Sequence, residues 1–101
     1  MKITIVTATY NSEKFIKSNI ESINNQTFQN YEHLIIDNKS KDNTLKISKQ
    51  YGIKLRIISE RDNGIYDAFN KGIRASKGEI ISILSSDDFY TDKNVLKEVI
   101  N

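Results

Sequence analysis

The hydrophobic residues of this chain fall into eight short blocks with two kinds of spacing. Four blocks are continuous or alternating runs rich in β-branched residues, which predict strands, and four repeat every three or four residues, which predict helices. Strands are predicted at 2–7, 32–36, 54–58 and 80–84, and helices at about 13–25, 44–51 and 65–76 and from Asp92 or Thr91 onward. Because strands and helices alternate, the pattern indicates βαβ units. We therefore expect an α/β fold, a Rossmann-like three-layer sandwich with a mainly parallel four-stranded sheet.

The same pattern predicts which surfaces are buried. The strand at 80–84 has four apolar residues in a run of five, which predicts burial on both faces. The strand at 54–58 alternates and is expected at a sheet edge. Asn11 or Ser12 is expected to cap the first helix. One side of the helix at 65–76 is predicted to face the core, and it carries Ile65, Ala68, Phe69, Gly72 and Ile73.

A polar cluster follows each predicted strand. The four clusters are Thr9-Tyr10-Asn11, Asp37-Asn38, Asp62-Asn63-Gly64 and Asp87-Asp88. The carboxyl ends of parallel strands meet at one edge of a sheet, and ligands of open α/β sheets bind there. The sequence therefore predicts a binding site built from these four clusters.

Composition narrows the classes of function. The 101 residues are 38% hydrophobic and 28% charged, with a net charge of +2 and no cysteine. These values fit a single domain over residues 1–101, and the scattered lysines argue against a nucleic-acid partner. No apolar run is long enough for a transmembrane segment, and the chain enters a strand directly, so we expect no signal peptide and a cytoplasmic location. The glycine patterns of dinucleotide folds and P-loops do not occur.

Acidic residues at strand ends suit a divalent cation that bridges to phosphate. Mg2+ and Mn2+ prefer oxygen ligands and commonly take one or two carboxylates, with phosphate and water at the other positions. Adjacent residues of an extended chain point to opposite sides, so we expect Asp87 and Asp88 to divide the work of binding metal and a hydroxyl group. Asp37 is placed to accept a hydrogen bond from a base or a ribose.

Each of these residues also has a purely structural explanation. The Asp87-Asp88 pair is able to cap a helix, Asp37 is able to form a turn, and Asp67 with Lys71 makes an ordinary i, i+4 ion pair. Thr9 and Tyr10 suit a loop equally well. His33 precedes a buried run without a nucleophile or metal partner, so it is given no catalytic role. Taken one at a time these explanations are preferable, but the convergence of four clusters favours a site.

Five stretches, in order along the chain, resemble the inverting family 2 glycosyltransferases of the GT-A type, which use nucleotide-sugar donors. They are TIVTATYN at 4–11, SINNQTFQNYE at 22–32, IIDNKSKDNT at 35–44, DNGIYDAFNKGI at 62–73, and GE at 78–79 with SSDD at 85–88. Three positions depart from the family pattern. Asn38 stands where the family has a second aspartate, Lys39 where it has glycine, and Ser85 at the first acid of a longer acidic motif.

The resemblance implies roles for particular residues. Thr9, Tyr10 and Asp37 are expected to contact the nucleotide, with Asp37 near the base. The ribose, the diphosphate and an Mn2+ or Mg2+ ion are expected at Asp87 and Asp88, a DXD-type motif in which Asp88 is the preferred direct metal ligand. Asp67 and Asn70 are expected near phosphate or sugar.

The resemblance also implies an activity. We expect the donor-binding portion of a transferase, the GT-A nucleotide-binding half, which moves a sugar from a nucleotide diphosphate, by preference a UDP-sugar, to a saccharide or lipid-linked acceptor in bacterial polysaccharide or glycoconjugate synthesis. Such an enzyme is expected in the cytoplasm or at the inner face of the membrane. Inverting transfer needs a general base, which we expect beyond Asn101, so the isolated chain is expected to be inactive. The alternative is a non-catalytic nucleotide-binding or assembly module that retains the fold.

Overall fold

The computed structural model describes residues 2–100. Four strands alternate with four helices, as the hydrophobic pattern predicts. The elements are β1 (Ile3–Thr9), α1 (Ile16–Asn24), β2 (Tyr31–Asp37), α2 (Thr44–Tyr51), β3 (Leu55–Ser59), α3 (Ile65–Ala75), β4 (Ile80–Ile83) and α4 (Val95–Ile100). Three strands run further than predicted, because Thr9, Asp37 and Ser59 are the last residues of β1, β2 and β3 and not the first residues of the loops that follow.

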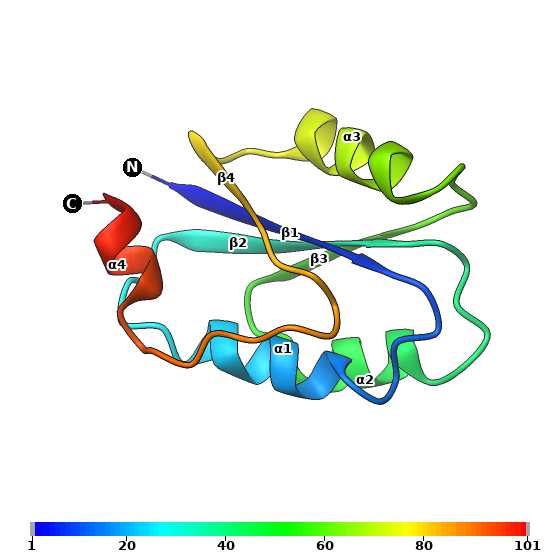
Figure 1. Ribbon diagram of the computed structural model, residues 1–101, viewed down its shortest axis with the longest axis horizontal. Coiled ribbons are helices and arrows are strands. Elements are labelled where there is room, and N and C mark those ends of the chain that lie inside the picture. Colours follow the sequence, from blue (N-terminus) through cyan, green and yellow to red (C-terminus); the bar gives the residue numbers. More distant parts are fainter. Residues whose placement is uncertain (1, 101) are drawn as a thin grey trace.

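The strands form one parallel sheet in the order β3-β2-β1-β4. The register places Thr9 of β1 beside Asp37 of β2, and Asp37 beside Ser59 of β3. Helices lie on both sides of the sheet, α3 on one side and α1 and α2 on the other (Figure 1). The predicted three-layer α/β sandwich with a parallel sheet is therefore confirmed. All four carboxyl ends of the strands point to the same edge.

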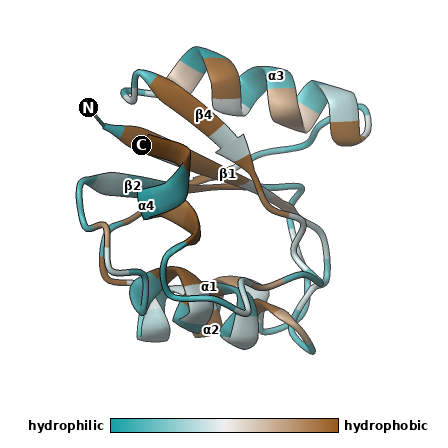
Figure 2. Ribbon diagram, turned by 60° about the vertical axis from the view of Figure 1, so that its left-hand side comes forward, coloured by the Kyte–Doolittle hydropathy of each residue, from teal (hydrophilic) through white to brown (hydrophobic). Residues whose placement is uncertain are grey.

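The core is split between the two faces of the sheet. Figure 2 shows that β1 is mostly hydrophobic along its length. On the α3 side, Val6 packs with Leu34, Ile36 and Ala68. The opposite face packs against α1, α2 and α4. Its fully buried members are Ile3, Ile5, Ile16, Ile20, Ile23, Ile35 and Leu96. Alternate residues of β1 and β2 thus serve different layers, as the two-residue period of a strand requires.

The strand β4 is not buried on both faces. It is an edge strand in the described part of the chain, because it pairs with β1 alone. Ile81 and Ile83 stand on the α3 side, where they are 38% and 48% exposed, because α3 packs over β1 and β2 and leaves them uncovered. The prediction that β3 lies at an edge is confirmed.

Two predictions about the helices need correction. The helix α1 begins at Ile16, and no side chain caps it, because the Ser12 carbonyl accepts the first turn's N–H groups from Phe15 and Ile16. On the predicted buried face of α3, Ala68 and Gly72 are buried, whereas Ile65 and Ile73 are 54% and 48% exposed. A Cβ at Gly72 would lie 2.5 Å from Val6 Cγ1, so the small residue sets how closely α3 approaches β1.

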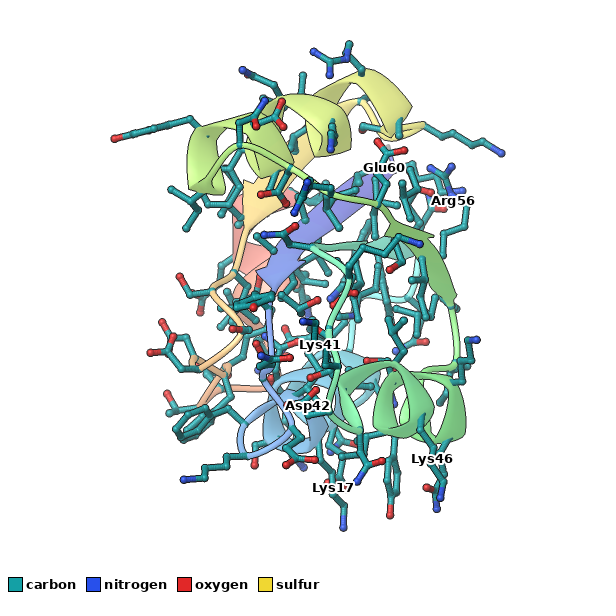
Figure 3. The ribbon with its side chains drawn as sticks, turned by 90° about the vertical axis from the view of Figure 1, so that its right-hand side faces the viewer. Lys17, Lys41, Asp42, Lys46, Arg56 and Glu60 are labelled. Carbon is teal, nitrogen blue, oxygen red and sulfur yellow. The ribbon has the colours of Figure 1, made fainter. Side chains whose placement is uncertain are left out.

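The amino-terminal edge of the sheet is held by Glu32. Its carboxylate accepts hydrogen bonds from Thr4 Oγ1 at 2.6 Å, the Lys77 backbone N–H at 2.7 Å and the Arg56 guanidinium at 3.0 Å. Burial alone would raise the pKa of Glu32, but these donors outweigh it and lower the pKa. Arg56 lies along β3, while Lys17 and Lys46 extend into solvent from the α1 and α2 layer (Figure 3). Among residues 2–100, no helix is long and apolar enough to cross a membrane.

Candidate functional site

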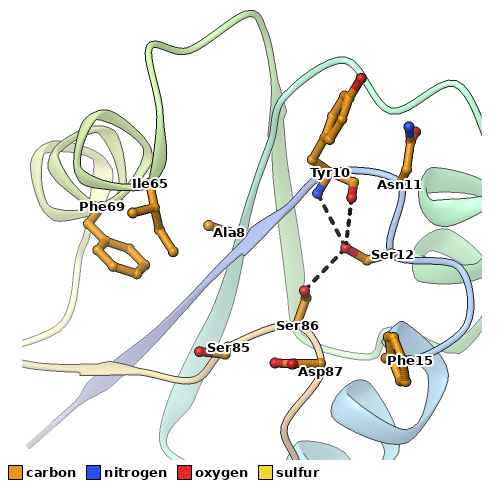
Figure 4. A pocket seen from close by; sticks show the side chains of 10 residues that line it. All are labelled: Ala8, Tyr10, Asn11, Ser12, Phe15, Ile65, Phe69, Ser85, Ser86 and Asp87. Carbon is orange, nitrogen blue, oxygen red and sulfur yellow. Dashed lines mark hydrogen bonds between the residues drawn. The ribbon is translucent and has the colours of Figure 1, made fainter.

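Two adjoining cavities of about 350 and 320 Å3 open at the carboxyl edge of the sheet. They share five lining residues: Ala8, Tyr10, Ser12, Ile65 and Ser86. Figure 4 shows Ile65 and Phe69 of α3 on one side, Tyr10 and Phe15 on the other, and residues 85–87 between them. The volumes lie in the range of small-molecule sites, and an apolar wall with a few polar groups is typical of such sites. The predicted convergence of the strand ends therefore produces a real concave surface.

The loops on the two sides of this cavity are joined by Ser12. Its hydroxyl donates to Ser86 Oγ at 3.1 Å and to the Tyr10 carbonyl at 3.4 Å, and it accepts from the Tyr10 backbone N–H at 3.2 Å (Figure 4). Its own backbone N–H donates to Thr44 Oγ1 at 2.7 Å. Ser12 was predicted as a helix cap. The structure assigns its hydroxyl to the contact between the loop after β1 and the turn after β4.

The acidic turn after β4 places its two carboxylates differently. Asp87 is exposed, lines the cavity and has no hydrogen-bond or ion-pair partner among the described residues. Asp88 is also exposed, but it is not part of the lining, and its Oδ1 accepts from the Phe89 backbone N–H at 2.9 Å. The turn is closed by the Asp88 N–H donating to the Ser85 carbonyl at 3.0 Å. No group of three or more His, Cys, Asp or Glu able to hold a metal ion occurs in residues 2–100.

The carboxylate of Asp37 is in the opposite situation, because it is fully buried. Its Oδ1 accepts from Thr9 Oγ1 at 2.6 Å and Ser40 Oγ at 2.5 Å, and its Oδ2 accepts from the Ser40 N–H and Ser59 Oγ, both at 2.9 Å. The strand register explains the Thr9 and Ser59 contacts, since these residues flank Asp37 in the sheet. Thr9 lines the smaller cavity, whereas Asp37 does not. The contact of Asp37 with a nucleotide base stays a prediction.

The loop that follows Asp37 contains a strained residue. Lys39 has a φ of 50°, which lies in the left-handed region that glycine occupies without cost. The turn therefore keeps the backbone shape that suits the glycine of the family pattern. This shape brings the N–H and hydroxyl of Ser40 onto Asp37.

The predicted site residues on α3 lie outside both cavities. Asp67 Oδ2 accepts from the Asn63 N–H at 2.9 Å, a contact that lowers the Asp67 pKa, and it lies 3.6 Å from Lys71 Nζ. The structural explanation by an i, i+4 ion pair therefore holds for Asp67. Asn70 is exposed on the same helix. Their contacts with phosphate or sugar stay predictions.

The loop before α3 does reach the cavity, through Asp62. The carboxylate of Asp62 accepts from the Gly64 N–H at 3.1 Å, and its own N–H donates to Asn38 Oδ1 at 3.1 Å. Asn38, Asp62 and Gly64 together line the cavity of about 320 Å3. Asn38 thus joins the loops after β2 and β3 through a bond between its side chain and the Asp62 backbone.

The only histidine does not contribute to the site. His33 is buried in β2, and its Nε2 shares a hydrogen bond of 2.9 Å with Thr7 Oγ1. Burial lowers the His33 pKa from 6.5 to about 3, so the ring is neutral at physiological pH. The ring therefore lies inside the sheet, and the absence of a catalytic role for His33 stays a prediction.

Several lining residues were not found from the sequence. Phe15, Ile65 and Phe69 supply the apolar walls, and Ser12 and Ser86 supply hydroxyl groups. Phe15 gives one signal in the sequence, because it lies outside the apolar stripe of the first helix. In the structure it is 51% exposed. Ile65 and Phe69 give none, because their helical spacing resembles that of core residues.

With the geometry established, comparison with known proteins identifies the relatives. Residues 4–101 match the family described as Glycosyl transferase family 2. The putative glycosyltransferase EpsH of Bacillus subtilis (strain 168) is 33% identical over 90 residues, which cover 86% of this chain and 26% of EpsH. The poly(ribitol-phosphate) beta-glucosyltransferase of Bacillus spizizenii is 36% identical over 104 residues, which cover 96% of this chain and 16% of that protein. This chain therefore spans 26% or less of the length of these two relatives.

Solved structures give the same picture. S. aureus TarS in complex with UDP-GlcNAc superposes with a TM-score of 0.92 and 29% identity, covering 99% of this chain and 30% of that one. The mannosyltransferase PcManGT from Pyrobaculum calidifontis, solved with GDP-Man and Mn2+, has a TM-score of 0.90 and 23% identity, covering 97% and 31%, and supports the fold alone. The match over residues 4–101 and the shared parallel sheet lead to one conclusion: the chain belongs to glycosyltransferase family 2 and has the GT-A fold.

Proposed function

We propose that this chain binds the nucleotide diphosphate of a sugar donor, with UDP as the preferred nucleotide, and does so through Mn2+ or Mg2+. The observation that carries the proposal is the free carboxylate of Asp87 on the wall of the cavity at the carboxyl edge of the sheet. Membership of glycosyltransferase family 2 supports the donor class, and the UDP-GlcNAc complex of TarS supports UDP.

The residues present fit a divalent cation. Asp87 and Asp88 offer oxygen atoms that Mg2+ and Mn2+ prefer, and both side chains are exposed at one turn. Such ions commonly take one or two protein carboxylates and complete their coordination with phosphate and water, so two carboxylates suffice. The ion would neutralise the charge of the diphosphate, while the exposed rings of Tyr10 and Phe15 offer apolar surface to the nucleoside.

In the whole enzyme, this binding would serve inverting transfer of the sugar to a saccharide or lipid-linked acceptor in bacterial polysaccharide or glycoconjugate synthesis. The poly(ribitol-phosphate) beta-glucosyltransferase among the relatives supports transfer to a polymeric acceptor. The role of this chain is to hold the donor and orient its diphosphate. The acceptor hydroxyl must lose a proton to a general base during the attack.

A second candidate is nucleotide binding without catalysis. It is favoured by the lining of the two cavities, because Asp62 and Asp87 are the only carboxylic acids among the described lining residues and none of those lining residues is a histidine. Asp87 is assigned to the cation, and Asp62 accepts a bond from Gly64. The chain is incubated with UDP-sugars and Mn2+, and chromatography detects released sugar or transferred product. Transfer or donor hydrolysis would eliminate the binding-only function.

The proposal is tested by titrating the 15N-labelled chain with UDP and Mg2+, and then with UDP and Mn2+. We expect chemical-shift changes at Tyr10, Ser12 and Asp87 with Mg2+, and paramagnetic broadening centred on Asp87 and Asp88 with Mn2+. UMP is the control, because it lacks the second phosphate that bridges to the cation. Unchanged amide signals at these residues in the presence of UDP and either metal would contradict the proposal.

A further inference from the structure

The stretch between β4 and α4 is the longest connection in the structure and carries the acidic turn. It runs from Leu84 to Asn94 without regular secondary structure. At its two ends the Leu84 N–H donates to the Val6 carbonyl of β1 and the Asn94 carbonyl accepts from the Glu98 N–H of α4, but the backbone groups between them need other partners. Figure 1 shows this stretch passing across α1.

The partners come from one face of α1 and the residues just after it. Asn19, Ser22 and Gln26 lie at i, i+3 and i+7, which places them on one side of a helix, and Thr27 follows. The Tyr90 N–H donates to Ser22 Oγ at 3.0 Å. We call these four residues, Asn19, Ser22, Gln26 and Thr27, the α1 rail.

The far end of the rail holds the beginning of α4. Gln26 Nε2 donates to the Asp92 carbonyl at 2.7 Å, and Gln26 Oε1 accepts from the Leu96 N–H at 3.1 Å. The Thr27 N–H donates to the Lys93 carbonyl at 2.8 Å. Gln26 and Thr27 are the Q-T pair of the second family-like stretch, and neither lines the donor cavity.

The near end of the rail is Asn19, which forms hydrogen bonds with the acidic turn. Its Nδ2 donates to the Ser85 carbonyl at 3.0 Å and to the Asp88 carbonyl at 3.1 Å. These two carbonyls flank Ser86 and Asp87, the two central residues of the turn, which line the cavity. Because both acceptors are carbonyl oxygens, they fix which end of the Asn19 amide carries the nitrogen.

Asn19 is an unfavourable residue for its position if stability alone is considered. It is fully buried in a helix, where asparagine is a poor helix former, and its Oδ1 has no hydrogen-bond partner among the described residues. A buried acceptor without a partner destabilises the folded state. The two bonds from its Nδ2 to the turn are what the structure gains from this side chain.

We propose that Asn19 is a positioning residue for donor binding, and that the α1 rail fixes the position and orientation of the acidic turn relative to the cavity. By holding the carbonyls of Ser85 and Asp88, Asn19 keeps the Asp87 carboxylate on the cavity wall and limits its motion. It controls affinity for a metal-bound nucleoside diphosphate without touching the ligand. This inference rests on the proposed function for its ligand, but the restraint of the turn is a property of the chain alone.

The test compares Asn19→Leu with the matched control Asn24→Leu. Leucine branches at Cγ as asparagine does, but it carries two methyl groups in place of the amide oxygen and nitrogen, so it lacks both N–H donors. Asn24 lies on the same helix, and its Nδ2 donates to a backbone carbonyl, that of Tyr51 at 2.8 Å, away from the turn. Both variants lose hydrogen bonding from a side-chain amide to a backbone carbonyl. Only Asn19→Leu loses the hydrogen bonds to the acidic turn.

The first measurement is hydrogen exchange in the ligand-free chain. We expect exchange of the Asp88 amide, which bonds to the Ser85 carbonyl, to accelerate at least tenfold in Asn19→Leu relative to the core amides of β1, and to stay unchanged in Asn24→Leu. The second measurement is UDP affinity with and without Mn2+. We expect at least tenfold weaker binding with Mn2+ in Asn19→Leu, unchanged binding without metal, and no change in Asn24→Leu.

The outcomes separate this inference from the proposed function. If the unsubstituted chain fails to bind UDP with Mn2+, the proposed function fails, and the exchange of the Asp88 amide alone decides whether Asn19 restrains the turn. If the chain binds and Asn19→Leu keeps the same Mn2+ dependence, the positioning role is overturned while the proposed function stands. Asn19→Ala is the second variant if Asn19→Leu does not fold. Unfolding of both would overturn the proposal, because Asn19 would then be required by the whole fold.

Discussion

The acidic residues at the ends of β2 and β4 share one edge of the sheet but differ in what surrounds them. Asp37 is fully buried, and four donors from Thr9, Ser40 and Ser59 occupy its two oxygens. Asp87 is exposed and has no partner among the residues that the structure describes. A carboxylate whose oxygens are occupied by the protein stabilises the fold, whereas one with free lone pairs is available to a cation. Position at a strand end therefore does not by itself identify a ligand-binding acid.

The largest effect is expected when the buried carboxylate is removed. Asp37→Ala leaves the hydroxyls of Thr9, Ser40 and Ser59 without their acceptor, so we expect the free energy of unfolding to fall by about 3 kcal/mol. Urea denaturation followed by circular dichroism measures this loss. The matched change Asp87→Ala should alter stability by less than about 0.5 kcal/mol. Equal losses in the two variants would remove the distinction between the two acids.

His33 tests how burial affects the pKa of a ring that has one hydrogen-bond partner, Thr7, among the described residues. The pKa of His33 falls from 6.5 to about 3 on folding because of burial, so the unfolded chain binds a proton between these values and the folded chain does not. Stability should therefore decrease as the pH falls below 6.5, by about 1.4 kcal/mol per pH unit, or about 2 kcal/mol from pH 7 to pH 5.

Urea titrations between pH 5 and 7 measure this slope, above the range in which the carboxylates titrate. His33→Gln cannot gain the proton and serves as the control. The prediction fails if this variant keeps the slope of the unsubstituted chain. A shallow slope in both chains would contradict the lowering of the His33 pKa by burial.

The exposed acids should affect binding without affecting stability. For Asp87→Asn combined with Asp88→Asn, we expect at least tenfold weaker binding of UDP in the presence of Mn2+, because the charged oxygen ligands are lost. Isothermal titration calorimetry with and without Mn2+ measures the effect. Asp92→Asn is the control, since Asp92 is an exposed acid five residues after Asp87 that does not line the donor cavity. A similar loss of UDP affinity in Asp92→Asn would mean that the negative charge of the chain as a whole, and not the acidic turn, governs binding.

The smallest effect is expected in the turn that brings Ser40 to Asp37. Lys39 occupies the left-handed region, and glycine relieves the clash of its Cβ while making the unfolded chain more flexible. These effects oppose each other, and we expect Lys39→Gly to raise the free energy of unfolding by about 0.5 kcal/mol. Lys41→Gly, at a position without a positive φ, should lower it instead. Thermal unfolding of both variants distinguishes them, and stabilisation by both would argue against strain at Lys39.

The sequence was sufficient for the architecture because the architecture depends on local periodicity. Apolar runs and helical stripes identified all eight elements, and their alternation identified the parallel sheet and the edge at which polar residues gather. The prediction that β4 is buried on both faces was wrong for a physical reason. A run of apolar residues records the character of a strand, but the number of neighbours beside it is a property of the assembled sheet.

The family-like stretches found the region of the site, but the use of each acid was decided by tertiary structure. The donors that occupy Asp37 include Thr9 and Ser59, which lie 28 and 22 residues away in the chain and meet Asp37 only through the strand register. The grip of Asn19 on the acidic turn spans 66 and 69 residues. Sequence alone determined that carboxylates stand at these strand ends. Which carboxylate is saturated and which is free depended on contacts between distant segments, which no local pattern records.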